Sequence, residues 1–353
     1  MYGAEKVLLN LASVSEQAEW DFGFYLIEGC DFESGELRKK IEPYTNNLSS
    51  IASKSKFDWH VIKQIRELSH RYTIIHTHDY KSLVLVSIAL TFRDTKIVHH
   101  IHGALGNTFL EKVYSKVELL FMLGAKKIIT VSHEQKNDLS KFKLLRNEII
   151  QVNNGTKIHD AMNTHKINDA LNLLMVARFT PEKNHSKAID VVHLLVKKGL
   201  KVKLNLLGDG PCFDDIKYKV KQLNLSDAVN FIGFTHDVEH WLNRSQLTML
   251  TSVTEGLPMT VLESMASGVP VISTPVGEVP SLIEHSNGGW LAEDVEEFAS
   301  MIEEVILNPE KLYISGNNAF EYAKSQLSID NQLKQLLSIY EGLSGDYYER
   351  FSL

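Results

Sequence analysis

The feature that most constrains the fold is an alternation, repeated in two series along the chain, between short apolar runs and amphipathic helical stretches. The strand-like runs of the first series are residues 22–27, 73–76, 96–101 and 127–131. Those of the second series are residues 171–176, 202–207, 229–231, 247–250 and 269–272. This alternation predicts two tandem α/β domains, each a doubly wound parallel sheet covered by helices. Two such domains form a cleft beyond the carboxyl ends of their strands, where open α/β sheets bind ligands.

The chain of 353 residues is also too long for a single ordinary core. Residues 156–168 are polar and lack periodicity, as linkers do. We therefore predict an N-terminal domain over residues 1–160 and a C-terminal domain over residues 161–325. Residues 326–353 are expected to form a helix that crosses back towards the N-terminal domain.

Composition excludes several classes of protein. A net charge of -7 argues against a broad nucleic-acid surface, which needs a basic excess. The longest apolar run, residues 83–92, is about half the roughly 20 residues that cross a bilayer, so we expect a cytoplasmic protein. Cys30 and Cys212 lie far apart without ligands at metal spacing, which favours two reduced thiols and no structural zinc.

The most informative stretch, residues 252–282, reads SVTEGLPMTVLESMASGVPVISTPVGEVPSL. Here a strand ends and Glu255 precedes a helix that contains Glu263. Pro258 lies near the first helical turn, where its fixed φ fits and its missing N–H is not needed. The amino end of a helix suits an anionic or hydroxyl-rich ligand, and a carboxylate can accept two hydrogen bonds from a sugar diol. Alternatively, the two acids are surface residues at a helix start, where the dipole also favours Glu.

The Glu-x7-Glu spacing, with Gly-Leu-Pro inside it and SGVPVI after it, resembles glycosyltransferase family 4 of the GT-B fold. The resemblance implies that Glu255 contacts the transferred sugar and Glu263 the ribose. It also implies that the loop of Gly256, Leu257 and Pro258 contacts the sugar or phosphate.

A second match, LLMVARFTPEK at residues 173–183, places Arg178 and Lys183 after a strand. In the family a basic pair here holds the donor diphosphate. Fixed cations stabilise the negative charge that builds on a departing nucleoside diphosphate. Alone, the two residues would be solvated loop charges.

Two further loops of the C-terminal half resemble the family. The segment NFIGF implies that Gly233 and Phe234 lie beside the nucleotide base, although such a loop is also typical of an ordinary turn. Gly277 follows the strand at 269–272, and we expect it near the phosphate and the sugar.

The N-terminal half contributes His102, which lies in IVHHIHG at the end of a predicted strand and matches a family position facing donor sugar and acceptor. A satisfied core histidine is the alternative. The run of His99, His100 and His102 argues little for a metal, because alternate strand residues face opposite sides and no carboxylate partners it. His76 and His78 favour a structural role, and Ser132 is expected to cap a helix.

The start of the chain departs from the family pattern, since MYGAEKVLLNLA begins inside the expected glycine-rich loop and the first N-terminal strand is missing. We keep Gly3 as a phosphate-facing amide.

The resemblance implies a retaining glycosyltransferase that moves a sugar from a UDP- or GDP-sugar donor to a saccharide or lipid-linked saccharide acceptor, in cell-surface polysaccharide biosynthesis. It leaves open a peripheral contact with the inner membrane. We expect no cofactor and no metal, because no Asp-x-Asp pair is placed to chelate a metal-diphosphate. A GT-B sugar-nucleotide epimerase and a non-catalytic nucleotide-sugar-binding protein remain the alternatives.

Overall fold

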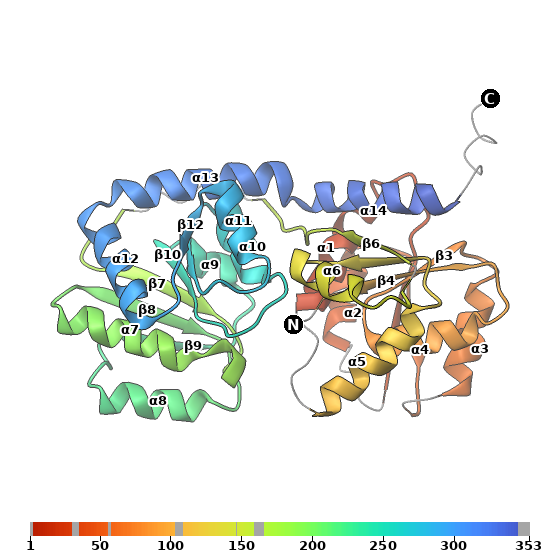
Figure 1. Cartoon of the computed structure of the whole chain (residues 1–353), viewed down its shortest axis with the longest axis horizontal. Helices are drawn as coiled ribbons and strands as arrows, with labels where there is room; N and C mark the ends of the chain where they lie inside the picture. The colour runs from red at the N-terminus through yellow and green to blue at the C-terminus, as the bar shows by residue number, and fades with distance from the viewer. Residues whose placement is uncertain are drawn as a thin grey trace. The chain divides into compact units, whose positions relative to one another are not determined.

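A computed structural model describes the chain (Figure 1) over residues 3–29, 35–55, 58–102, 109–145, 147–158 and 166–344. The chain divides into two compact units. Unit 1 comprises residues 1–155 and 329–353, and unit 2 comprises residues 156–328. Cys30 and the predicted domain boundary at 160/161 lie outside the described residues.

Unit 2 is built on one six-stranded parallel sheet with the order β12-β11-β10-β7-β8-β9. Its strands are β7 (Leu171–Val176), β8 (Val202–Leu207), β9 (Val229–Gly233), β10 (Leu247–Leu250), β11 (Val271–Ser273) and β12 (Gly289–Leu291). Its helices are η2 (Pro181–Lys183), α7 (His185–Lys197), α8 (Phe213–Gln222), α9 (Val238–Leu242), α10 (Met259–Ala266), α11 (Val279–Ser286), α12 (Val295–Leu307) and α13 (Glu310–Gln326). The predicted strands β7, β8 and β10 match to the residue, whereas β12 was not predicted.

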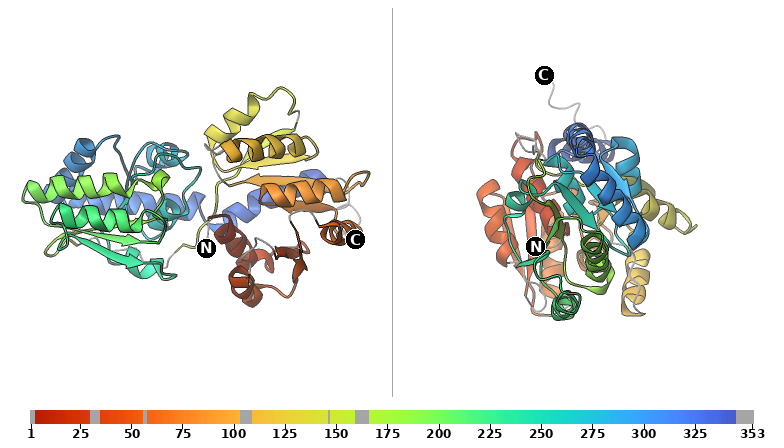
Figure 2. Two further views of the ribbon diagram at one scale, coloured as in Figure 1. Left: turned by 90° about the horizontal axis from the view of Figure 1, so that it is seen from below. Right: turned by 90° about the vertical axis from the view of Figure 1, so that its left-hand side faces the viewer.

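Helices cover both faces of this sheet, as Figures 1 and 2 show. Successive strand residues face opposite sides, so Leu173 and Met175 pack in the main core with α7, α8 and α12. Leu174, between them, packs on the other face with Leu242 of α9. Because both faces are buried, the strands read as continuous apolar runs, which is why they could be found in the sequence.

The strands of unit 1 divide between two parallel sheets. The smaller pairs β1 (Phe24–Glu28) with β2 (Leu48–Ala52), and the larger has the order β3-β4-β5-β6. The larger sheet contains β3 (Ile74–Thr77), β4 (Lys96–Ile101), β5 (Lys127–Thr130) and β6 (Glu148–Gln151). Within the described residues β1 and β3 share no ladder, so the two sheets of unit 1 are separate.

The helices of unit 1 are α1 (Gly3–Ser15), α2 (Gly35–Ile41), η1 (Glu42–Tyr44), α3 (Trp59–Leu68), α4 (Tyr80–Ala89), α5 (Phe109–Met122), α6 (His133–Ser140) and α14 (Ile329–Ser344). The predicted cap of α6 is confirmed, because the amide of Gln135 donates to the Ser132 hydroxyl at 3.2 Å. The tail helix, α14, contacts α1 and is counted in unit 1. No helix within the described residues has both the length and the apolar character needed to span a bilayer.

Candidate functional site

The loops that follow the strands of unit 2 are joined to one another by backbone hydrogen bonds at the carboxyl edge of the sheet. Four such bonds link neighbouring loops: Phe179 N to Asp209 O (3.0 Å), Gly208 N to Gly233 O (2.9 Å), Val253 N to Glu182 O (2.7 Å) and Glu278 N to Gly256 O (2.9 Å). Together they form a continuous rim, which we call the carboxyl rim. Every site residue predicted in the C-terminal half lies on this rim or on α10, which starts from it.

Lys183 and Glu255 form the charged centre of the carboxyl rim. The Lys183 ammonium donates to Oε1 of Glu255 at 2.5 Å, and the Ser252 hydroxyl donates to the same oxygen at 2.7 Å. The two side chains are 24% and 10% exposed, so this pair is only partly accessible to water. Lys183 reaches the pair from the loop after β7 and Glu255 from the loop after β10. The sequence predicted both residues but missed Ser252, which opens the same motif.

The backbone beneath this pair is fixed by Thr251, whose hydroxyl donates to the carbonyl oxygens of Lys183 (3.2 Å) and Asn184 (3.0 Å). Asn184 has φ +50 and accepts, through its side chain, from the amide of Lys187 to cap α7. The loop after β7 is therefore held at the C-terminal end of its short 3-10 turn, Pro181–Lys183. Arg178 lies earlier on this loop with an exposed side chain.

Glu263 lies on α10 and is 9% exposed. Helix α10 begins at Met259, so Pro258 lies immediately before the first helical turn, near which it was expected, with extended φ -71 and ψ 120. Pro258 provides no side-chain cap, and the first amides of a helix have no partner within it. The Thr260 hydroxyl donates to the Val176 carbonyl at 3.0 Å and anchors this helix start against the end of β7.

Gly277 brings the loop after β11 into contact with the loop that carries Glu255. Its φ is +54, and a Cβ placed on it would lie 2.2 Å from the Gly256 carbonyl oxygen and 2.6 Å from that of Glu255. Only glycine fits this approach. Gly233 ends β9, and the following Phe234 ring is 58% exposed, which leaves an aromatic face on the rim.

A buried histidine, His185, which was missed by the sequence analysis, packs against a residue of the carboxyl rim. The ring of His185 stacks on Phe179 with centroids 4.0 Å apart. Burial, with a smaller contribution from the Lys183 charge, lowers the pKa of His185 to about 4. His185 is therefore neutral at physiological pH and adds no charge beside Lys183.

Gly3 and His102 belong to unit 1. Gly3 begins α1 and His102 follows β4. The Nε2 of His102 shares a hydrogen bond with Nδ1 of His78 at 2.8 Å. Burial, with a smaller effect of His99, lowers the pKa of His102 to about 3.

The expected alternation along β4 is observed, since His99 and His100 face opposite sides. His99 bonds to the Thr77 hydroxyl (2.8 Å) and to Glu118 (3.0 Å). His100 instead lies among His76, His78 and His102, with ring centroids 5.5, 5.4 and 4.1 Å away. The sequence argument against a histidine cluster was therefore incomplete, because it considered only the strand that carries His99 and His100. The neighbouring β3 and the residue after its end supply two more imidazoles, those of His76 and His78.

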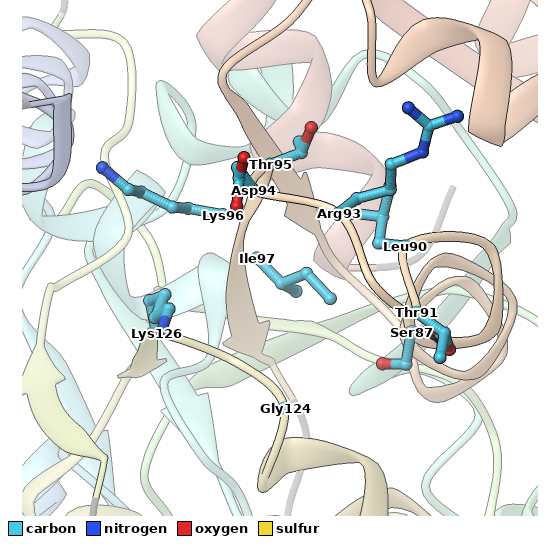
Figure 3. Close-up of a pocket in the computed structure, with 10 residues that line it drawn as sticks. All are labelled: Ser87, Leu90, Thr91, Arg93, Asp94, Thr95, Lys96, Ile97, Gly124 and Lys126. Carbon is cyan, nitrogen blue, oxygen red and sulfur yellow. Dashed lines mark hydrogen bonds between the residues drawn. The ribbon is translucent and has the colours of Figure 1, made fainter.

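A hollow of about 570 Å³ lies elsewhere, at the amino ends of β4 and β5 (Figure 3). Its lining includes Arg93, Lys96 and Lys126. No predicted site residue lines it. Because parallel α/β sheets bind ligands at the carboxyl ends of their strands, we assign this hollow no role in the site.

Two models of glycosyltransferase families match consecutive parts of the chain. "Glycosyl transferases group 1" matches residues 159–322, and "Glycosyltransferase Family 4" matches residues 1–159. An uncharacterized glycosyltransferase of Haemophilus influenzae is 27% identical over 97% of this chain and 96% of its own length. The UDP-Gal:alpha-D-GlcNAc-diphosphoundecaprenol alpha-1,3-galactosyltransferase of Escherichia coli is 24% identical over 66% of each chain.

Among solved structures, HepE of Anabaena in complex with UDP-glucose superposes with a TM-score of 0.81 at 19% identity. The match covers 97% of this chain and 96% of that one. This likeness shows a shared fold, that of the GT-B glycosyltransferases.

The close approach at Gly277 gives a testable prediction. Gly277→Ala combines a strained φ with a clash against two carbonyl oxygens, so it should lower the free energy of unfolding by about 1–3 kcal/mol or more. Gly199 has φ +78 but nothing within 4 Å of a built Cβ, so Gly199→Ala carries the φ strain alone and should lower it less. Urea unfolding of both variants measures the difference, and equal losses would contradict the close approach.

Proposed function

Because the chain belongs to the family 4 glycosyltransferases, we propose that it transfers a sugar from a UDP- or GDP-sugar to a saccharide or lipid-linked saccharide acceptor, with retention of anomeric configuration. The matched relatives are transferases, which is why we favour transfer over the epimerase and the non-catalytic binding protein. The name of the Escherichia coli relative specifies a diphosphoundecaprenol acceptor, which supports a lipid-linked acceptor here.

The observation that carries the proposal is the Lys183–Glu255 pair on the carboxyl rim. In our assignment Lys183 and Arg178 hold the donor diphosphate, Glu255 contacts the transferred sugar and Glu263 the ribose. The loop of Gly256, Leu257 and Pro258, with the amino end of α10, supplies amides to the phosphate or the sugar. Gly277, on the loop after β11, lies against this loop, and we assign it a position near the phosphate and the sugar.

The remaining assignments are proposals from the family resemblance. Gly233 and Phe234 lie on the base side, where the exposed aromatic ring can stack on a nucleobase. Gly3 offers an amide to the diphosphate. His102 faces the donor sugar and the acceptor.

The ion pair explains how binding and chemistry are coupled. A bound diphosphate brings a second anion to Lys183, which competes with Glu255 for the ammonium group. A freed Glu255 oxygen can then accept hydrogen bonds from sugar hydroxyls. Binding of the diphosphate to Lys183 therefore also makes Glu255 available to the sugar.

We propose a front-face reaction. The acceptor oxygen forms the new bond to the anomeric carbon on the face from which the nucleoside diphosphate departs. The leaving phosphate oxygen takes the acceptor proton. Arg178 and Lys183 stabilise the charge on that oxygen as fixed cations, so we propose that transfer needs no metal and no cofactor.

We place the reaction in the cytoplasm, where nucleotide sugars are made, with a peripheral contact at the inner membrane when the acceptor is lipid-linked. The acidic net charge of -7 supports the expectation of no nucleic-acid partner.

Diphosphate binding is tested by Lys183→Ala. Removing a charge-assisted hydrogen bond of about 1.5–3 kcal/mol should weaken UDP or GDP binding by about 10- to 100-fold in calorimetry. Lys187→Ala is the matched control, because Lys187 lies four residues on and donates to the Glu293 carbonyl at 2.7 Å. Unchanged affinity in Lys183→Ala would remove the phosphate assignment.

The role of Glu255 is tested by Glu255→Gln. This change removes the anion that competes for Lys183, so UDP or GDP should bind as well as before or more tightly, while kcat for transfer falls by at least about tenfold. Calorimetry and initial-rate kinetics on the same preparation separate the two effects. A loss of nucleotide affinity with an unchanged kcat would overturn the assignment.

Retention is tested by NMR of the purified product. We expect the new glycosidic bond to have the same anomeric configuration as the donor sugar, read from the anomeric coupling constant at early times. The opposite configuration would rule out the front-face reaction.

A further inference from the structure

Four imidazoles gather on one face of the larger sheet of unit 1. His76 lies on β3 and His78 two residues later, while His100 lies on β4 and His102 two residues later. Strands β3 and β4 are parallel neighbours, with His76 opposite Val98 and Thr77 opposite His99. Side chains two residues apart in a strand face the same side, so the two strands deliver two histidines each to the same place.

The hydrogen bonds of these rings leave specific nitrogen atoms without a partner. Nδ1 of His76 shares a hydrogen bond with the Tyr340 hydroxyl at 2.6 Å, and Nδ1 of His78 is bonded to His102. In these four rings, Nε2 of His76, Nδ1 of His102 and both nitrogens of His100 are buried without a hydrogen-bond partner. His100 is 0% exposed. A buried polar atom without a partner costs about 1–3 kcal/mol, so these atoms together call for a ligand.

We propose that His76, His78 and His100 bind a transition-metal ion of the zinc, cobalt or nickel class. One ring nitrogen from each of the three lies within 4.8 Å of the others, and this is the one such group found in the part of the chain that the structure describes. Ligand nitrogens around a tetrahedral zinc ion, each about 2.1 Å from it, lie about 3.4 Å apart. Small rotations of the rings close that difference.

The chemistry of the cluster favours a metal of this class. Imidazole nitrogens are preferred ligands of zinc, copper and nickel, whereas magnesium and calcium require oxygen. No carboxylate belongs to the group.

Two of the three proposed ligands are also held through their other ring nitrogen, as in many metal sites. A histidine ligand usually donates or accepts a hydrogen bond through its other nitrogen, which fixes the ring. Tyr340 holds His76 in this way and His102 holds His78. The Tyr340 ring packs beside Trp20 and Phe22, at 5.7 and 6.3 Å between centroids. A bound ion would therefore tie β3 and β4 to α14.

This role differs from that of the donor site. The cations assigned to the diphosphate and the acids assigned to the sugar and the ribose belong to unit 2, whereas the three proposed metal ligands belong to unit 1. The ion is a structural element of unit 1, and it fixes the ring of His102 through His78. Donor binding remains metal-independent.

The experiment titrates Co²⁺ into the full chain, free of any affinity tag and stripped of metal, and follows visible absorption. We expect one equivalent to give the intense d–d bands of a four- or five-coordinate ion, Zn²⁺ to displace it, and Zn²⁺ to raise the Tm. The weak spectrum of six-coordinate Co²⁺, or no saturable binding, would overturn the proposal.

Variants then locate the site. His100→Gln and His78→Gln should each weaken Co²⁺ binding by at least about tenfold, because each removes a ligand. Tyr340→Phe keeps the ring but loses the hydroxyl, and should weaken it by about tenfold. His60→Gln is the control, since His60 is exposed on α3 and bonded to Gln64. Wild-type Co²⁺ affinity in both His100→Gln and His78→Gln would overturn the proposal. If either variant does not fold, the Co²⁺ spectrum of the wild-type chain decides whether the proposal holds.

Discussion

The ion pair between Lys183 and Glu255 is the interaction on which the account of this chain depends. It joins the loop after β7 to the loop after β10, with Ser252 on the same carboxylate oxygen. Both loops are otherwise anchored by backbone bonds, so the two charges are presented by a rigid frame. A cation and an acid held together at the carboxyl edge of a parallel sheet match the needs of a diphosphate and the sugar attached to it.

Much of unit 2 could be predicted because its strands are buried on both faces and read as apolar runs. Strands β2, β6 and β12 were missed because none of them reads as a long apolar run. β2 reads LSSIA, with two serines among its five residues, and β12 has only three residues. The site residues proposed in unit 2 were predicted from motifs that are local in sequence. Ser252 was missed because a serine before a turn is common in loops that have no functional role.

The histidine cluster shows what a sequence cannot supply. The alternation of side chains along β4 was anticipated, and His99 does face away from His100. The pairing of β3 with β4, and the register that sets His76 and His78 beside His100, depends on tertiary structure. Tyr340 is farther still, 264 residues from His76 in sequence, and only the position of α14 in unit 1 brings the two together.

The central claim is that the carboxyl rim of unit 2 holds an activated sugar between fixed cations and acids. A crystal structure of the chain with UDP or GDP bound tests it most directly. The account predicts diphosphate oxygens within hydrogen-bond distance of Lys183 and Arg178, with the ribose hydroxyls on Glu263. A nucleotide bound away from the rim, or an unbroken Lys183–Glu255 pair with the diphosphate elsewhere, would contradict it.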